Sequence, residues 1–233
     1  MDSIVTAHPE LQEEAEESAS SALPLVLAQL EEDIALGRLR PRERLVEDDL
    51  IQRFKTKRHI VREALIQLER MGVVVRRRNR GATVRDLNPN EVEQIYLVRT
   101  LLERQAAQMI PLPAPHLAGE LERIHQLHTE AVKAGALVQV FRLNLEFHRV
   151  LFAGCGNPYL AEAIEVYAQK THGIRSYAIA RPNLLTRARD EHAAMIAALS
   201  EGDRERLVAL CTSHLVHSKD AYIQAYRQIF PEA

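Results

Sequence analysis

The chain has 233 residues, with 30 Lys and Arg, 32 Asp and Glu, 10 His and 46% hydrophobic residues. This mix allows one large domain or two small ones, and it excludes a collagen-like repeat or a chain disordered throughout. Only two cysteines are present, Cys155 and Cys211, which excludes a disulfide framework. No apolar run predicts a membrane span, and no N-terminal pattern predicts a secretory signal, so we expect a soluble cytoplasmic protein.

The net charge of −2 hides an uneven distribution. Residues 1–20 contain six acids and neither Lys nor Arg, which predicts an acidic, mobile tail. Residues 36–85 contain fifteen Lys and Arg against six acids, a net charge of +9, so the rest of the chain sums to about −11. Such a division is typical of two modules with different partners, and it favours nucleic acid as the partner of the basic one.

The basic module, residues 21–86, contains three predicted helices and a hairpin. Apolar residues at helical spacing predict helices at about 22–36, 46–54 and 59–71. Two short strands, 73–75 and 82–84, flank a turn rich in Arg. Three helices followed by a basic β-hairpin wing are the plan of a winged helix-turn-helix domain that binds DNA.

The third helix is the predicted recognition helix. Its N-terminal end would enter the major groove, where Arg58 or Arg62 could donate two parallel hydrogen bonds to guanine. The basic turn would hold phosphates or enter the minor groove, and Gly81 would let the backbone approach the DNA closely. The predicted DNA-contacting residues are Lys57, Arg58, His59, Arg62, Arg77, Arg78, Arg80 and Gly81.

Two strings in this module are specific: Val-Arg-Glu-Ala-Leu at 61–65 and Asn-Arg-Gly at 79–81. Together with Gly-Arg-Leu-Arg-Pro at 37–41 they resemble the N-terminal domain of the GntR superfamily of bacterial transcription regulators. Arg42 stands where that family usually has Gly after the Pro, and Lys55 replaces the usual Gly of the helix turn. Further departures, which bear on the operator sequence rather than on the fold, are Lys57, His59 and Ile60 in place of Ser, Thr and Pro.

After a linker at 87–89, the acidic module at 90–230 is predicted to be entirely helical. Helices are expected at about 90–109, 115–134, 137–153, 158–180, 184–200 and 203–228, between breaks that contain Pro or Gly. Six helices of this length predict a compact bundle. The expected fold class is mainly α: an N-terminal winged helix-turn-helix of three helices and a small β-hairpin wing, followed by an all-α six-helix bundle.

Three of these helices carry a His on their apolar stripe. The three residues are His148, His192 and His214. Burying three imidazoles is costly unless each finds a partner, and one divalent metal ion would satisfy all three. Asn144, one turn before His148, lies on the same helical face. The alternative, equally compatible with the spacing, is that each is a core His bonded to a backbone carbonyl. His125 and His128 are expected to be solvated, and His217 is expected at the surface.

Strings around these residues resemble the FCD effector domain of FadR-type regulators, in its VanR-like branch. They are Asn-Leu-Glu-Phe-His at 144–148, Gly-Asn-Pro-Tyr-Leu at 156–160, Asp-Glu-His at 190–192 and His-Leu at 214–215. The resemblance implies a metal held by an Asp, a His four residues later and two further His. Those positions are Asn144, His148, His192 and His214 here. Asn brings no charge, which implies weaker binding, with Zn, Ni and Mn as candidate ions.

The resemblance also implies a small carboxylate effector in the bundle core. Arg99 matches an Arg often found near that pocket and could pair with the carboxylate, and Arg175 and Tyr177 could line the cavity too. The other interpretation of Arg99, equally compatible with the sequence, is an exposed helix residue paired with Glu103.

The sequence therefore predicts a ligand-responsive, homodimeric transcription regulator rather than an enzyme. We expect it to bind double-stranded DNA at a palindromic operator and to act as a repressor that the effector releases. One alternative is a metal-dependent enzyme that uses the His cluster. Against it, no HExxH string is present, and Glu146 and Glu191 are expected to point away from the cluster. The other alternative is a DNA-binding protein whose helical domain is purely structural and holds no ligand.

Overall fold

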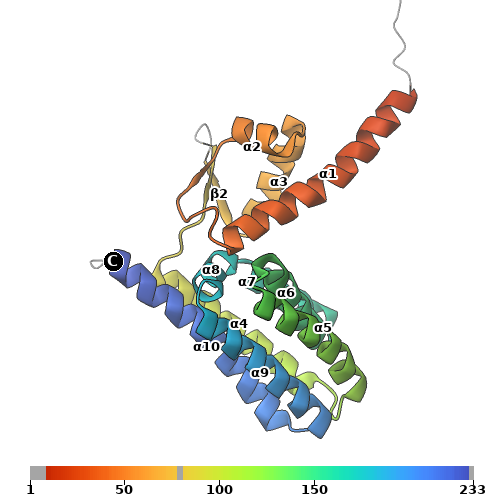
Figure 1. Cartoon of the computed structure of the whole chain (residues 1–233), viewed down its shortest axis with the longest axis vertical. Coiled ribbons are helices and arrows are strands. Elements are labelled where there is room, and N and C mark those ends of the chain that lie inside the picture. Colours follow the sequence, from red (N-terminus) through yellow and green to blue (C-terminus); the bar gives the residue numbers. More distant parts are fainter. Residues whose placement is uncertain (1–8, 78–80, 231–233) are drawn as a thin grey trace, which may run out of the picture.

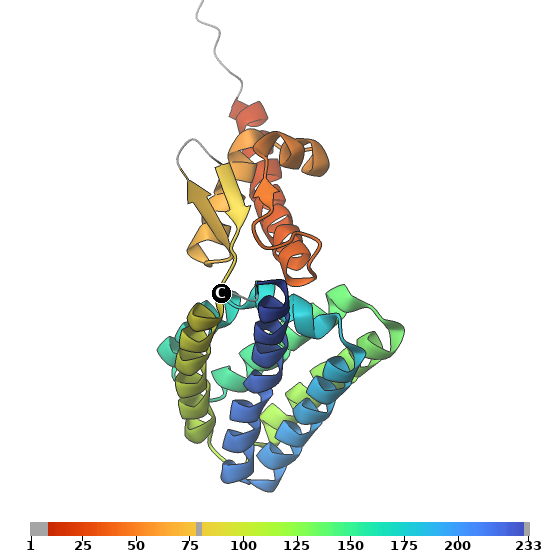
Figure 2. The same cartoon turned by 90° about the vertical axis from the view of Figure 1, so that its left-hand side faces the viewer.

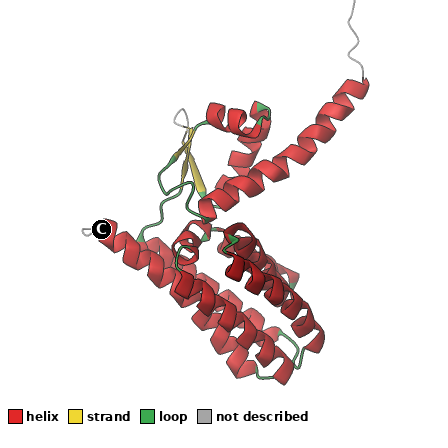
Figure 3. Ribbon diagram, viewed as in Figure 1, coloured by secondary structure: helices red, strands yellow, loops and turns green. Residues whose placement is uncertain are grey.

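A computed structural model describes residues 9–77 and 81–230. The N-terminal domain contains α1 (Pro9–Ala35), α2 (Glu47–Phe54) and α3 (Arg58–Arg70) beside a small sheet (Figures 1 and 3). Its strands are β1 (Arg44–Leu45), β2 (Val74–Arg77) and β3 (Gly81–Val84), in the antiparallel order β1-β3-β2. The winged helix-turn-helix prediction is confirmed, with β1 as a third strand that two residues were too few to signal.

Helix α1 begins well before the predicted residue 22. Residues 1–8 of the predicted tail lie outside the described residues, but residues 9–20 are helical. A helix over residues 9–20 was not expected from the sequence. The physical reason for this helix is that the stretch is rich in Glu, Ala, Leu and Gln, which are strong helix formers. The N-terminal half of α1 projects away from the other helices in Figure 1.

A buried carboxylate joins the helices of the N-terminal domain. Asp33 of α1 is 1% exposed, and it forms ion pairs with Arg38 and with Arg53 of α2. The apolar core around it comes from α1, α3 and the sheet, and includes Leu30, Leu65 and Leu68.

Two turns of this domain hold a non-glycine residue in the left-handed conformation. Arg42 has φ 69° and Lys55, the C-cap of α2, has φ 49°. These are the two positions where the sequence departs from the usual Gly. The turn geometry is thus retained although an L side chain disfavours it.

The C-terminal domain contains seven helices among the described residues (Figure 2). They are α4 (Pro89–Met109), α5 (Pro115–Ala134), α6 (Leu137–Ala153), α7 (Pro158–Gln169), α8 (His172–Ile179), α9 (Pro182–Glu201) and α10 (Arg204–Ile229). The fold class is confirmed, but the helix predicted at 158–180 is divided. At Thr171 the hydroxyl bonds to the carbonyl of Ala168 at 2.7 Å, a local contact that competes with helix continuation. None of the described helices is both long and apolar enough to cross a membrane.

Helix α8 lies between the two domains. At its start, His172 is fully buried, with Nδ1 2.9 Å from Oε1 of Glu31 in α1. A second contact pairs Arg142 of α6 with the next acid of α1, Glu32. In Figures 1 and 2, α8 sits at the end of the helical domain that faces α1. The N-terminal domain therefore contacts the helical domain through α8 and α6 as well as through the linker.

Candidate functional site

The predicted DNA-binding residues that the structure describes are exposed at the start of α3 and on the wing. Lys57, its N-cap, is exposed, as are the Arg58, His59 and Arg62 side chains, and the first turn of α3 carries no acid. On the wing, Arg77 is exposed and Gly81 has φ +79°, which a side chain would strain. The predicted contacts Arg78 and Arg80 lie outside the described residues.

The two recognition-helix arginines are held by acids of α2, which the sequence interpretation missed. Arg62 donates from Nε to Oε2 of Glu47 at 2.9 Å, and Arg58 donates to Oδ1 of Asp48 at 2.5 Å. Arg58 and Arg62 remain 52% and 56% exposed, so these surface pairs are weak and can exchange for a phosphate or a base. The run of acids at the start of α2 was the available signal.

In the helical domain, the three predicted His come together. His148, His192 and His214 arise from α6, α9 and α10, and one ligating nitrogen of each lies within 4.8 Å of the others. The Nε2 atoms of His148 and His214 are 3.2 Å apart. Two nitrogens bound at 2.0–2.1 Å around a tetrahedral ion would be about 3.3 Å apart, so this pair already has the spacing of metal ligands.

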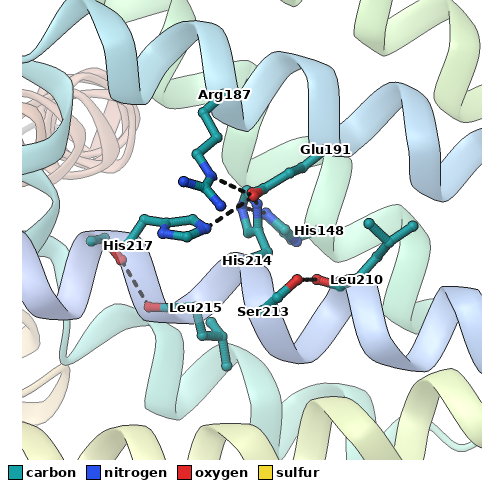
Figure 4. A network of polar contacts seen from close by, with 9 residues as sticks. His148, Arg187, Glu191, Leu210, Ser213, His214, Leu215 and His217 are labelled. Atoms are coloured by element: carbon teal, nitrogen blue, oxygen red, sulfur yellow. Dashed lines mark hydrogen bonds and ion pairs between the residues drawn. The ribbon is translucent and has the colours of Figure 1, made fainter.

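The orientation of His214 is set by Glu191 (Figure 4). Oε2 of Glu191 lies 2.7 Å from Nδ1 of His214, and its Oε1 lies 3.1 Å from Nε2 of His217 and accepts from Arg187. Burial opposes ionisation of Glu191, but the bonds to His214 and Arg187 prevail and lower its pKa to about 2. A carboxylate needs a donor, so Nδ1 of His214 carries the proton and Nε2 is left toward His148.

Two expectations are corrected by this network. Glu191 was expected to point away from the cluster because it adjoins His192 in sequence. Its side chain is nevertheless long enough to contact His214 on α10. His217 was expected at the surface, but it is only partly exposed and lines the same cavity as His148 and His214. Glu191 of α9 therefore joins His214 and His217, which both lie on α10.

The donor set fits a metal ion. Burial lowers the pKa values of His148 and His192 well below the usual range, which keeps both imidazoles in the neutral form that binds metals. Both nitrogens of His192 are buried and have no hydrogen-bond partner among the described residues. Such orphaned nitrogens are costly unless a ligand satisfies them. Asn144 is half-buried on the wall of the cavity that His148 and His214 line.

The same cavity contains two arginines in different electrostatic states. Arg99 is 5% exposed, and its guanidinium pairs with Glu103 at 2.8 Å and donates to Thr171 at 3.0 Å. The interpretation of Arg99 as an exposed helix residue is therefore wrong, since Arg99 packs under α8, although its pairing with Glu103 is present. Because Glu103 compensates this charge, Arg99 is poorly placed to hold a second carboxylate alone.

Arg175, by contrast, has a buried nitrogen, Nη1, that lacks a hydrogen-bond partner among the described residues. Burial and the nearby Arg99 lower its pKa to about 10, so it stays charged at neutral pH. The structure does not bring Tyr177 to this cavity, because its ring packs edge-on against Tyr222 with centroids 5.0 Å apart. The expectation that Tyr177 lines the effector cavity is corrected accordingly.

Two further histidines were placed wrongly by the sequence. His128 is 2% exposed, and His125 is partly buried, although both were expected in solvent. His128 continues the stripe of Leu121 and Ile124, which are fully buried against the neighbouring helices. The polar residues around it on α5 masked this periodicity.

Comparison with known proteins follows the two domains. Residues 25–84 match the gntR family of bacterial regulatory proteins, and residues 94–217 match the FCD domain. The HTH-type transcriptional regulator YdhC of Bacillus subtilis (strain 168) is 29% identical over 141 residues, 59% of this chain and 62% of YdhC. The matched region thus spans less than two thirds of that relative. McbR of Escherichia coli (strain K12), also an HTH-type transcriptional regulator, is 24% identical over 179 residues, 76% of this chain and 81% of McbR.

Solved structures share the fold. E. coli McbR/YncC superposes with a TM-score of 0.75 at 21% identity, over 88% of this chain and 98% of that one. A putative transcriptional regulator GntR from Rhodococcus sp. RHA1 gives 0.74 at 21% identity, over 89% and 100%. At this identity the likeness establishes the architecture alone.

Proposed function

Because the chain belongs to the GntR family of bacterial regulatory proteins and carries an FCD domain, we propose that it represses transcription until a small carboxylate effector binds. The family and the relatives are DNA-binding transcription regulators rather than enzymes. The observation that carries the effector proposal is a single cavity lined both by Arg175, whose Nη1 has no hydrogen-bond partner among the described residues, and by His148 and His214 of the His cluster.

On DNA, two copies of the chain form a homodimer on a palindromic operator in the cytoplasm. Each α3 enters a major groove, where Arg58 and Arg62 exchange their α2 carboxylates for bases or phosphates. The wing, with Arg77 and the predicted contacts Arg78 and Arg80, follows the adjacent phosphates. The exposure of the start of α3 supports this arrangement.

A divalent ion, Zn, Ni or Mn, is held by Asn144, His148, His192 and His214. Three imidazoles favour Zn or Ni over Mn, which prefers oxygen ligands. When bound, the ion supplies open positions for carboxylate oxygens. Glu191 keeps His214 in the correct tautomer, and Phe147, stacked on His192 at 4.0 Å, fixes that ring.

The effector's carboxylate binds Arg175, the cation of this cavity whose Nη1 has no partner among the described residues. A carboxylate there relieves two costs at once, because it satisfies a buried donor and neutralises the repulsion between Arg175 and Arg99. The apolar wall, with Phe141 and Leu185, limits the remainder of the ligand to a small organic body. A cavity of this kind argues against a purely structural helical domain.

Helix α8 carries the signal to the DNA-binding domain. Arg175 lies on α8, and one turn earlier His172 of the same helix meets Glu31 of α1. A ligand that draws Arg175 toward the cavity therefore acts on a helix that contacts α1. The size of the response equals the difference in the effector's affinity for the two arrangements of the dimer.

The test begins with operator fragments selected from genomic DNA with the full-length protein. Fluorescence anisotropy then measures DNA affinity with Zn(II) present, while acetate, succinate or citrate is added. We expect at least one acid to weaken DNA binding, and Arg175→Ala to bind DNA normally but lose the response. Tighter DNA binding would reverse the sign of regulation, and an unchanged response of Arg175→Ala would refute the effector site.

A further inference from the structure

A second group of three histidines lies beside the cavity. One ligating nitrogen each of His125, His128 and His192 lies within 4.8 Å of the other two. His125 and His128 are three residues apart on α5, which places them on one helical face, while His192 arises from α9. The ring centroids of His128 and His192 are 5.3 Å apart, and those of His125 and His192 are 6.5 Å apart.

These imidazoles have no other partner in the described structure. Nδ1 of His125, Nδ1 of His128 and both nitrogens of His192 are buried and make no hydrogen bond to any described residue. His128 is 2% exposed and His192 is fully buried. Grouping three imidazoles without acceptors is costly, since each leaves a buried polar atom unsatisfied.

The spacing and the surroundings suit a cation. Ligand nitrogens at 2.0–2.1 Å from a tetrahedral ion lie about 3.3 Å apart, which small rotations of the two α5 side chains would provide. Stacking on Phe147 holds the His192 ring in place. Burial lowers the pKa of His125, which favours the neutral imidazole that binds metals, and the carboxylates of Glu122 and Asp190 lie close enough to attract a cation. The opposing charge of Arg189 is paired with Asp190 at 2.6 Å.

We propose that His125, His128 and His192 form a second site for a divalent transition-metal ion of the Zn(II), Ni(II) or Cu(II) class. It uses α5, which contributes nothing to the ligand set Asn144, His148, His192 and His214. The two sites meet only at His192, a residue with two free nitrogens in the described structure. A neutral imidazole offers a single nitrogen lone pair to a metal, so an ion at the α5 site competes with the ion of the proposed effector cavity for His192.

The experiment isolates the α5 site in the full-length protein. The double variant His148→Ala/His214→Ala removes two ligands of the cavity site and leaves the second cluster intact. After chelator treatment, Co(II) binding is followed by visible absorption, and Zn(II) is followed by calorimetry and elemental analysis. We expect this variant to bind one ion. Adding His125→Gln and His128→Asn, which keep polar side chains in place, should weaken that binding by more than about 100-fold.

Matched controls keep the result interpretable. His116, an exposed histidine near the start of α5, lies outside both clusters, so His116→Ala in the same double variant should leave the ion bound. Circular dichroism verifies that every variant remains folded. The proposal is overturned if the His148→Ala/His214→Ala protein binds no ion, or if binding survives the α5 substitutions. If the α5 site exists but the cavity site does not, the wild-type protein should bind one ion. That ion should be lost only when the α5 histidines are replaced.

Discussion

Lys55 provides a direct test of how a turn built for glycine tolerates another residue. It caps α2 with φ 49° and ψ 42°, and its exposed side chain forms no ion pair with any described residue. The left-handed conformation costs a non-glycine residue about 1–2 kcal/mol. Glycine also makes the unfolded chain more flexible, which lowers the free energy of unfolding by about 0.4–1 kcal/mol. Lys55→Gly should therefore stabilise the N-terminal domain by about 0.5–1 kcal/mol.

Native-state amide exchange measures this change for the N-terminal domain alone. Val61 and Leu65 of α3 are buried in its core, so their exchange reports the opening of that domain. Lys55→Asn, which tolerates the left-handed region better than Lys does, should give a smaller gain of the same sign. Unchanged or faster exchange in Lys55→Gly would refute the inference that the turn is strained.

Arg42 is the matched contrast, because its φ of 69° makes the same demand on the backbone. Its side chain, however, donates to Asp86 at 2.5 Å and lies 4.4 Å from the ring centroid of Phe230. Arg42→Gly gains the same backbone relief but loses both contacts. By amide exchange, Arg42→Gly should therefore stabilise the N-terminal domain less than Lys55→Gly does, or destabilise it.

Three further predictions concern the DNA surface, the core and the metal cluster. Arg62→Ala should weaken operator binding by about 1–3 kcal/mol without changing the fold, whereas Glu47→Gln should tighten operator binding by releasing Arg62. Anisotropy titrations measure both affinities, and values equal to that of the wild-type protein would contradict the recognition-helix assignment. Asp33→Ala should destabilise the N-terminal domain by about 1–3 kcal/mol because Arg38 and Arg53 lose a buried acceptor, while Asp33→Asn should cost less; amide exchange decides. Glu191→Gln should lower metal affinity about 10–100-fold, as read by elemental analysis after dialysis, and full retention of metal would exclude its role in orienting His214.

Local patterns accounted for the elements and for the His cluster itself. The apolar spacing of α2 and α3 and the Gly72 break predicted the helix-turn-helix, and inward stripes predicted that His148, His192 and His214 would converge. These features depend on which face of a helix is apolar, and that information is written along a single segment.

The network around the cluster depended on packing between segments. Glu191 of α9 was expected to point away from the cluster, yet it contacts His214 of α10. Tyr177 packs against Tyr222 instead of lining the cavity. Thr171, where the predicted helix is divided, likewise accepts a hydrogen bond from Arg99, 72 residues away. Such contacts are invisible to periodicity because each partner lies on a different element.

Charge, turn residues and apolar period are local properties, and they were enough to predict a basic winged helix-turn-helix joined to a helical bundle with histidines inside. Which of the buried polar groups find a partner depends on packing between distant segments. Packing buries the Arg99–Glu103 pair, leaves Nη1 of Arg175 without a partner among the described residues, and buries His128 beside His192. The physical reason is that the state of a buried charge or imidazole is set by the neighbours that packing brings within a few ångströms, and those neighbours come from distant parts of the chain.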